Sequence, residues 1–292
     1  MREVARDAES KAEGGGRRTE RIRIGNQTSI SSDPMTPFDY AIGHRFDAFE
    51  WFPDRRPDGR GWSEGDLSPR ARASIRNAAR EHDIALSVHG AWDASLLSAA
   101  GNDTLLSQAE FAAEIGASTF VVHHSSADGL DQCVDGIGSL VGWLARHGIR
   151  IVVENTPQTS AGDVNELFRR LFSRGLPAGS VGMCFDIGHA NLCPSTRNDY
   201  VGYLDQLAPD TPILHVHLHE NWGDEDSHLT LFTGPAARDA AGVEALVDRL
   251  GRRHFSGCMI LEQWPHPPGL LDLARDRLVR IIGATAAKFR AS

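Results

Sequence analysis

Cysteine, basic charge and long apolar runs are all scarce in this chain of 292 residues. Its four cysteines, Cys133, Cys184, Cys193 and Cys258, form neither a Cys-x-x-Cys pair nor a dense disulfide pattern, which favours a reducing cytoplasm as the location. The net charge of -9 disfavours nucleic acid and anionic membrane surfaces as partners. No apolar run reaches the roughly 20 residues of a membrane span. The sequence leaves the oligomeric state open, and a homo-oligomer is one of the possibilities.

Residues 1–20 lack apolar periodicity as well. They read MREVARDAESKAEGGGRRTE, a mixture of both charges with three consecutive glycines and no apolar signal core. Such a segment has little surface to bury, so we predict a disordered, flexible leader there. The folded domain is then expected to cover residues 21–292.

From residue 21 onward, short apolar runs alternate with helical patterns. The runs cover residues 21–30, 48–52, 84–90, 119–125, 150–156, 181–189, 213–221 and 258–264. The helical patterns lie near residues 37–45, 68–83, 105–115, 133–146, 164–172, 200–207, 243–253 and 271–289. Eight such units predict an α/β fold, a closed (β/α)8 or TIM barrel. An open doubly wound sheet fits less well, because IGNQTS in the first run is no GxGxxG phosphate turn.

The segment ILHVHLHENWGDEDSH, residues 213–228, is rich in histidine. His215, His217 and His219 alternate within an apolar run, so on a strand all three project from one face. Asp226 and His228 follow in a polar loop that can fold back over the strand end. A single histidine here would be explained as a buried, hydrogen-bonded side chain. Together these residues predict part of a metal site.

Polar residues also end the other predicted strands, where a TIM barrel builds its active site. They are His89, His123, Glu154, Asp186 with His189 after it, His217 and Glu262. Any one carboxylate could simply cap the next helix. Several carboxylates and imidazoles at one barrel mouth, however, would repel one another or lack partners unless a cation bound to their lone pairs. Imidazole-rich sites suit zinc or manganese better than magnesium or calcium, and we expect one to three such ions.

The motifs VVHHS, VVENT, CFDIGH, HVHLHEN, DSH and LEQW resemble those of the xylose isomerase-like barrel superfamily, which joins sugar isomerases and epimerases with endonuclease IV-type enzymes. The resemblance covers residues 21 to about 285. The sugar branch implies one metal on Glu154, Asp186, His217 and Glu262. The endonuclease branch implies three zinc ions on those four residues together with His89, His123, His189, Asp226 and His228. After His228, LTLFTGPAARD replaces the usual Gly-x-Gly turn of the substrate-covering loop.

Our preferred hypothesis is a metal-dependent isomerase or epimerase of a sugar, a sugar phosphate or a related polyol. Glu154 and Glu262 would act as the paired base and acid while the metal stabilises an enediolate. His89, His189, Trp92 and His228 are expected to contact this small-molecule substrate. Trp51 is a further candidate for an apolar wall, with plain core packing as the alternative.

The second hypothesis is a multinuclear metal phosphodiesterase acting on DNA. Its local support is the loop PDRRPDGRGW, where Arg55, Arg56 and Arg60 precede Trp62 and could contact phosphates and a base. A solvated arginine loop is the simpler explanation, and the acidic net charge argues against DNA. A lyase or an oxidative iron enzyme on the same barrel is a third possibility.

Overall fold

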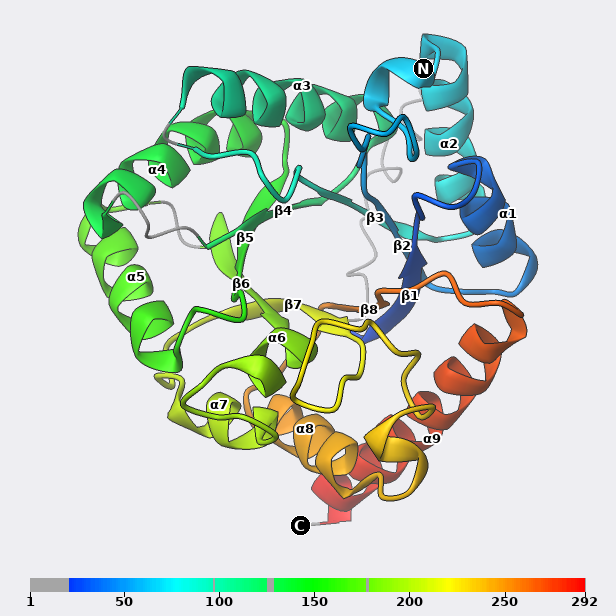
Figure 1. The fold of residues 1–292 in the computed structure, drawn as a ribbon, viewed down its shortest axis with the longest axis vertical. Helices are drawn as coiled ribbons and strands as arrows, with labels where there is room; N and C mark the ends of the chain where they lie inside the picture. The colour runs from blue at the N-terminus through cyan, green and yellow to red at the C-terminus, as the bar shows by residue number, and fades with distance from the viewer. Residues whose placement is uncertain (1–20, 97, 125–128, 177–178, 292) are drawn as a thin grey trace, which may run out of the picture.

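The computed structural model describes residues 21–96, 98–124, 129–176 and 179–291. The predicted leader, residues 1–20, lies outside the described residues. Figure 1 shows a central ring of strands surrounded by helices. The strands are β1 (Arg23–Gln27), β2 (Ala48–Trp51), β3 (Ala85–His89), β4 (Thr119–His123), β5 (Arg150–Glu154), β6 (Val181–Asp186), β7 (Ile213–Leu218) and β8 (Cys258–Leu261).

All neighbouring strands are parallel, and β1 pairs with β8 to close the ring in the order β1 to β8. The predicted (β/α)8 barrel is therefore confirmed. The helices are α1 (Met35–Gly43), α2 (Pro69–Glu81), α3 (Ala99–Ile115), α4 (Leu130–Arg146), α5 (Ala161–Ser173), α6 (Ile187–Leu192), α7 (Tyr200–Gln206), α8 (Ala241–Arg252) and α9 (Gly269–Ala291). None of the described helices has both the length and the apolar character that crossing a bilayer requires.

Capping side chains set several helix starts, including that of α3, which the apolar pattern placed too late, and that of α6, which it did not predict. Helix α3 begins at Ala99, six residues before the predicted pattern, because Ser98 Oγ accepts a hydrogen bond from Gly101 N and the first turn holds small, polar residues. The predicted strand 181–189 is also too long. It ends at Asp186, whose carboxylate accepts from His189 N and so starts the short helix α6.

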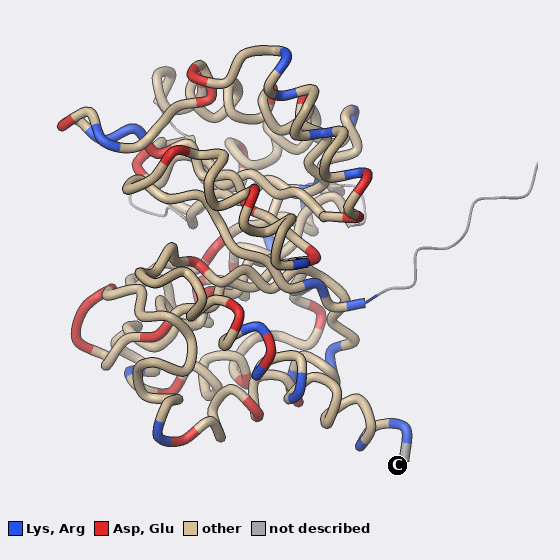
Figure 2. The backbone as a smooth tube through the Cα atoms, turned by 90° about the vertical axis from the view of Figure 1, so that its right-hand side faces the viewer, with Lys and Arg blue, Asp and Glu red and all other residues tan. Residues whose placement is uncertain are grey.

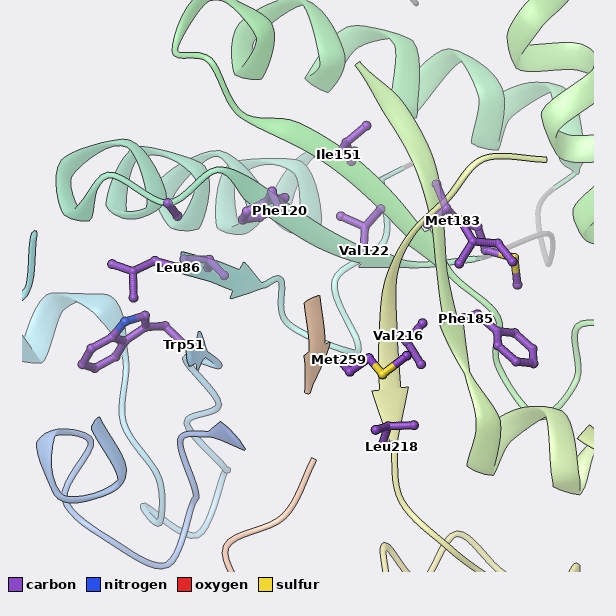
Figure 3. Close-up of a cluster of buried hydrophobic side chains, with 14 of the residues drawn as sticks. Trp51, Leu86, Phe120, Val122, Ile151, Met183, Phe185, Val216, Leu218 and Met259 are labelled. Atoms are coloured by element: carbon purple, nitrogen blue, oxygen red, sulfur yellow. The ribbon is translucent and has the colours of Figure 1, made fainter. Parts of the chain in front are cut away.

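Successive residues on each strand point alternately to the helices and to the barrel interior. Side chains such as Phe120, Val122 and Phe185 belong to the large apolar cluster that strands and helices share (Figure 3). Val121, Val152 and Cys184 form a separate small cluster, as expected of residues that point inward. The inner positions nearest the C-terminal strand ends are polar, and they form the candidate site.

Trp51 belongs to the apolar layer and does not line the mouth. Its side chain is fully buried, and its ring lies 5.0–6.1 Å from those of four other aromatic residues, Phe38, Phe49, Trp62 and Phe111. The suggestion that it walls the substrate site is therefore wrong. Its neighbour Glu50 takes the inward position, and alternation then turns Trp51 toward the helices.

The variant Trp51→Ala should lower the free energy of unfolding by about 3–5 kcal/mol, because it leaves a cavity in a well-packed aromatic layer. Equilibrium unfolding in denaturant would measure this. The control Leu273→Ala removes a side chain that is 67% exposed and should change stability by less than about 0.5 kcal/mol. A similarly small effect of Trp51→Ala would contradict its assignment to the core.

Candidate metal centre

Strand register brings the predicted site residues together. His123 on β4 is the partner of Glu154 on β5, and Asp186 on β6 is the partner of His217 on β7. Glu262 follows the last residue of β8. Because parallel strands end at the same rim, these side chains meet at one level of the barrel.

Three carboxylates converge on one ring nitrogen of His217. Its Nδ1 atom lies 3.3 Å from Glu154 Oε1, 3.6 Å from Glu262 Oε1 and 3.7 Å from Asp186 Oδ2. All four residues are buried. Within the described chain, His217 Nδ1 and one oxygen of each carboxylate have no hydrogen-bond partner. Buried groups of this kind need an explanation, and a divalent cation supplies one.

His89 and His123 approach Glu154 from the other side. Their Nε2 atoms lie 2.9 Å and 3.4 Å from Glu154 Oε2. Each Nδ1 is close to a backbone carbonyl oxygen, of Gly90 at 2.6 Å and of Trp92 at 3.2 Å. If each Nδ1–H donates to that carbonyl, Nε2 is free to bind a metal, a common arrangement of metal-binding histidines.

The loop after β7 returns Asp226 and His228 to the mouth. Glu220 and Leu229 form an antiparallel bridge, so residues 221–228 leave the strand end and come back to it. The Glu220 carboxylate then accepts hydrogen bonds from three backbone N–H groups of the following segment, those of Thr233, Gly234 and Ala236. This segment is the sequence that replaces the Gly-x-Gly turn, and Glu220 anchors it.

A cavity of about 580 Å³ opens beside these residues, within the range of small-molecule sites. It adjoins a smaller one of about 190 Å³, and the two share Trp92, His123, His189 and Asp226 in their walls. His89, His228 and Glu262 border the smaller cavity. Trp92 is about half exposed. The four residues expected to contact substrate, His89, Trp92, His189 and His228, thus all line the smaller cavity.

The arginine loop buries its tryptophan and pairs its arginines with acidic side chains. Trp62 is buried against Trp51 and Phe111, so it cannot stack on a base. Acidic partners already pair with the three arginines: Asp66 with Arg55, Asp54 with Arg56, and Asp58 with Arg60.

Sequence reasoning missed Glu50. This carboxylate is fully buried on β2. Its Oε1 lies 2.9 Å from His217 Nε2, and its Oε2 accepts from Ser87 Oγ at 2.8 Å and lies 2.9 Å from His215 Nε2. Neither Glu50 Oε1 nor His217 Nε2 has a hydrogen bond within the described chain, so the contact that holds His217 with Nδ1 toward the other carboxylates is one of charge and proximity. A carboxylate within the apolar run 48–52 was the feature of the sequence that could have identified Glu50 as a site residue.

Imidazoles and carboxylates shift each other's proton affinity. Burial alone would raise the pKa of Glu154, but His217 and His123 hold it well below its usual range. Burial raises the pKa of Glu262, and His217 and His228 offset only part of this effect. For His228, burial lowers the pKa, yet Asp226 and Glu262 raise it to about 9.

The model of the xylose isomerase-like TIM barrel family matches residues 38–280. The chain belongs to the xylose isomerase-like TIM barrel family. An uncharacterised protein of Sinorhizobium fredii is 29% identical over 152 residues, which is 48% of this chain and 47% of that relative. The chain thus matches about half the length of that relative.

Two solved structures that share this fold are named for different activities. A D-tagatose 3-epimerase-like protein has a TM-score of 0.70 and 19% identity, over 91% of this chain and 99% of that one. Endonuclease IV from Thermus thermophilus has a TM-score of 0.61 and 20% identity, again over 91% and 99%. Identities this low show the shared fold alone, so the reaction has to be argued from the site.

We predict that Glu50→Gln weakens divalent-metal binding by about 10- to 100-fold, because an amide holds the His217 ring less firmly than a carboxylate. Calorimetric titration of metal-free protein with zinc would measure the affinity. The control Glu110→Gln changes an exposed carboxylate on α3 and should bind as the wild type does. Equal affinities in all three proteins would show that Glu50 does not position His217.

Metal binding should release protons near pH 7. The raised pKa of His228, about 9, means that the metal-free ring is protonated below that pH, and the charge of a divalent cation bound beside it would favour loss of that proton. Affinity should therefore rise as pH rises toward 9. The same sign implies that metal-free protein loses stability as pH rises through 9, because the stabilising charge on His228 disappears. Calorimetry in buffers of different ionisation enthalpy would count the protons, and His228→Asn should release fewer.

Proposed function

We propose that the protein is a divalent-metal-dependent isomerase or epimerase of a sugar or related polyol. The observation that carries this proposal is the convergence of Glu154, Asp186 and Glu262 on His217 Nδ1 beside a cavity of small-molecule size. Glu154 ends β5 and Glu262 follows the last residue of β8, so these two carboxylates can reach a bound substrate from different sides. Proton transfer at carbon needs such a pair.

The donor set fits a zinc or manganese ion, because three carboxylates and one imidazole supply the oxygen and nitrogen ligands that these ions accept. Bound to these four residues, the ion would polarise a substrate carbonyl and the neighbouring hydroxyl. Glu154 would then remove the proton from the intervening carbon, and Glu262 would return one from the other side. His89, His189 and His228 would hold substrate hydroxyls, with the half-exposed Trp92 covering an apolar face of the ring.

The charges around the cavity favour an uncharged sugar over a sugar phosphate. In the described part of its wall, the larger cavity has Asp93 and Asp226 but no Lys or Arg. Arg56 borders the smaller cavity, where Asp54 pairs with it at 2.7 Å. A phosphate would therefore find no unpaired Lys or Arg among these residues.

A metal-dependent phosphodiesterase is the second candidate function. One observation favours it: the nine residues expected for three zinc ions all lie in or beside the site clusters. Against it stand the paired arginines of the 53–62 loop and the interspersed acidic and basic positions along the chain (Figure 2). DNA binding relies on many unpaired Lys and Arg contacts to phosphate.

Glu154→Gln and Glu262→Gln should each lower turnover by at least about 100-fold, since each removes one proton-transfer group, while circular dichroism shows a folded barrel. Incorporation of solvent deuterium into a panel of aldoses, ketoses and polyols, followed by NMR with zinc or manganese added, measures the reaction. The control Glu81→Gln lies on the exposed surface of α2 and should keep full activity.

Near-normal exchange in both site variants would refute the roles given to these glutamates. Wild-type protein that exchanges no sugar proton but cleaves DNA containing an abasic site would instead establish the second candidate function.

A further inference from the structure

A third cavity, which we call the α7 cavity, lies outside the barrel mouth. It is found where α6, α7 and the start of α8 lie side by side next to the loop after β7 (Figure 1). Its wall includes Asn191, Asn198, Tyr200, His219, Trp222 and Asp239. Its volume of about 390 Å³ is within the range of small-molecule sites. None of the described residues that line it also borders either cavity at the mouth.

Trp222 brings a large aromatic ring to the α7 cavity. Its side chain borders the cavity and is 49% exposed, although the residue directly follows the buried Asn221. The guanidinium of Arg238 lies over the indole, 5.6 Å from the ring centroid, and helps to hold it at the surface. The indole therefore keeps open surface on which the C–H groups of a ligand can pack.

Tyr200 contributes a hydroxyl group to the same cavity. Residue 242 on α8 is glycine, and a Cβ atom there would lie only 2.5 Å from Tyr200 Oη, so the glycine leaves room for this hydroxyl. Within the described chain, the Tyr200 hydroxyl has no hydrogen bond. Burial raises the pKa of Tyr200, and Glu220 and Asp239 add to this effect. The group is therefore uncharged and can both donate and accept a hydrogen bond.

Amide and carboxylate groups complete the polar part of the wall. Asn191 Nδ2 donates to Asn221 Oδ1 at 2.9 Å and is 3.4 Å from Asn198 Oδ1. These contacts orient the Asn198 amide and use only its oxygen, which leaves its Nδ2 as a donor. Asp239 Oδ1 accepts from Ala241 N at 2.9 Å, and its other oxygen is left as an acceptor. A donor and an acceptor on neighbouring residues suit a pair of adjacent hydroxyl groups.

The charges of the wall disfavour an anionic ligand. In its described part, the α7 cavity has the carboxylates of Glu220 and Asp239 but no Lys or Arg. The Glu220 carboxylate is already occupied, because it accepts hydrogen bonds from three backbone N–H groups. A phosphate or carboxylate would therefore lack a cationic partner. Uncharged hydroxyl groups match the remaining amide, phenol and carboxylate.

We propose that the α7 cavity binds one neutral sugar ring, with Trp222 against its C–H face and Asn198, Tyr200 and Asp239 on its hydroxyl groups. This sugar is a separate molecule from the substrate at the mouth, because the two places share no wall residue. The stacked rings of His219 and His228, 3.9 Å apart, stand between them: His219 borders the α7 cavity and His228 the mouth. The inference does not depend on which reaction the protein catalyses.

Methyl glycosides of the common hexoses and pentoses are the probes, because a methylated anomeric centre offers no free carbonyl for the proposed reaction. Ligand-observed NMR titrations with full-length, zinc-loaded protein should detect binding of at least one of them. Trp222→Ala should weaken this binding by at least about tenfold, since the ring supplies most of the apolar contact. Trp92→Ala, which changes the mouth, should leave the affinity unchanged.

Tyr200→Phe removes only a hydroxyl group and keeps the ring. We expect the affinity for the same glycoside to fall by about three- to tenfold, the usual effect of losing one hydrogen bond. The matched control is Tyr203→Phe on the same helix, whose hydroxyl donates to Thr159 O at 3.0 Å. That variant should unfold at a lower denaturant concentration, yet bind the glycoside as the wild type does.

Three outcomes would each reject the α7 cavity as a sugar site: no glycoside of the panel binds, Trp222→Ala binds as the wild type does, or Trp92→Ala alone loses binding. Disaccharide binding that is lost in both Trp222→Ala and Trp92→Ala would show one molecule spanning both places, and would also reject a separate site. Turnover is not measured in these titrations. A failure here therefore leaves the proposed isomerase or epimerase intact, and absence of that activity would leave a positive result standing.

Discussion

Glu154, Asp186 and Glu262 are buried at one level of the barrel, and in the described chain the basic side chains paired with them are histidines, not Lys or Arg. Transferring such charges out of water costs several kcal/mol each unless something compensates them. Imidazoles can do so only while protonated, which leaves the balance dependent on pH. A divalent ion compensates all three at once. The convergence of the three carboxylates on His217 is consistent with such a bound ion.

Much of this arrangement was predictable from the chain, because the end of each apolar run marks the rim of a parallel barrel. Glu154, Asp186, His217 and Glu262 were found that way. Glu50 was not, because it lies inside a run, and its partner His215 is 165 residues away. Only closure of the ring brings the two together. Once one residue of a strand is known to point inward, alternation fixes the rest.

Local chemistry explains the other differences between the predicted and observed structures. A capping carboxylate and a ligand carboxylate look alike in a sequence, and Asp186 serves the first role while lying in a cluster of residues that could hold a metal. The loop after His228 lacks the Gly-x-Gly turn, yet the Glu220 carboxylate anchors it by accepting hydrogen bonds from three backbone N–H groups. Such anchors depend on contacts between residues that no short motif joins, so periodicity cannot reveal them.

Strand β7 supplies an imidazole at three successive inward positions, about 6–7 Å apart along the strand. His215 meets Glu50 inside the barrel, His217 meets the three rim carboxylates, and His219 reaches the loop carboxylate Asp226. Neighbouring levels share a carboxylate, because Glu50 contacts both His215 and His217, and Asp186 contacts both His217 and His219. A single catalytic ion needs only the middle level with its support below. The outermost level lies where the loop after β7 meets the barrel, and there the His219 ring stacks on that of His228 from the loop.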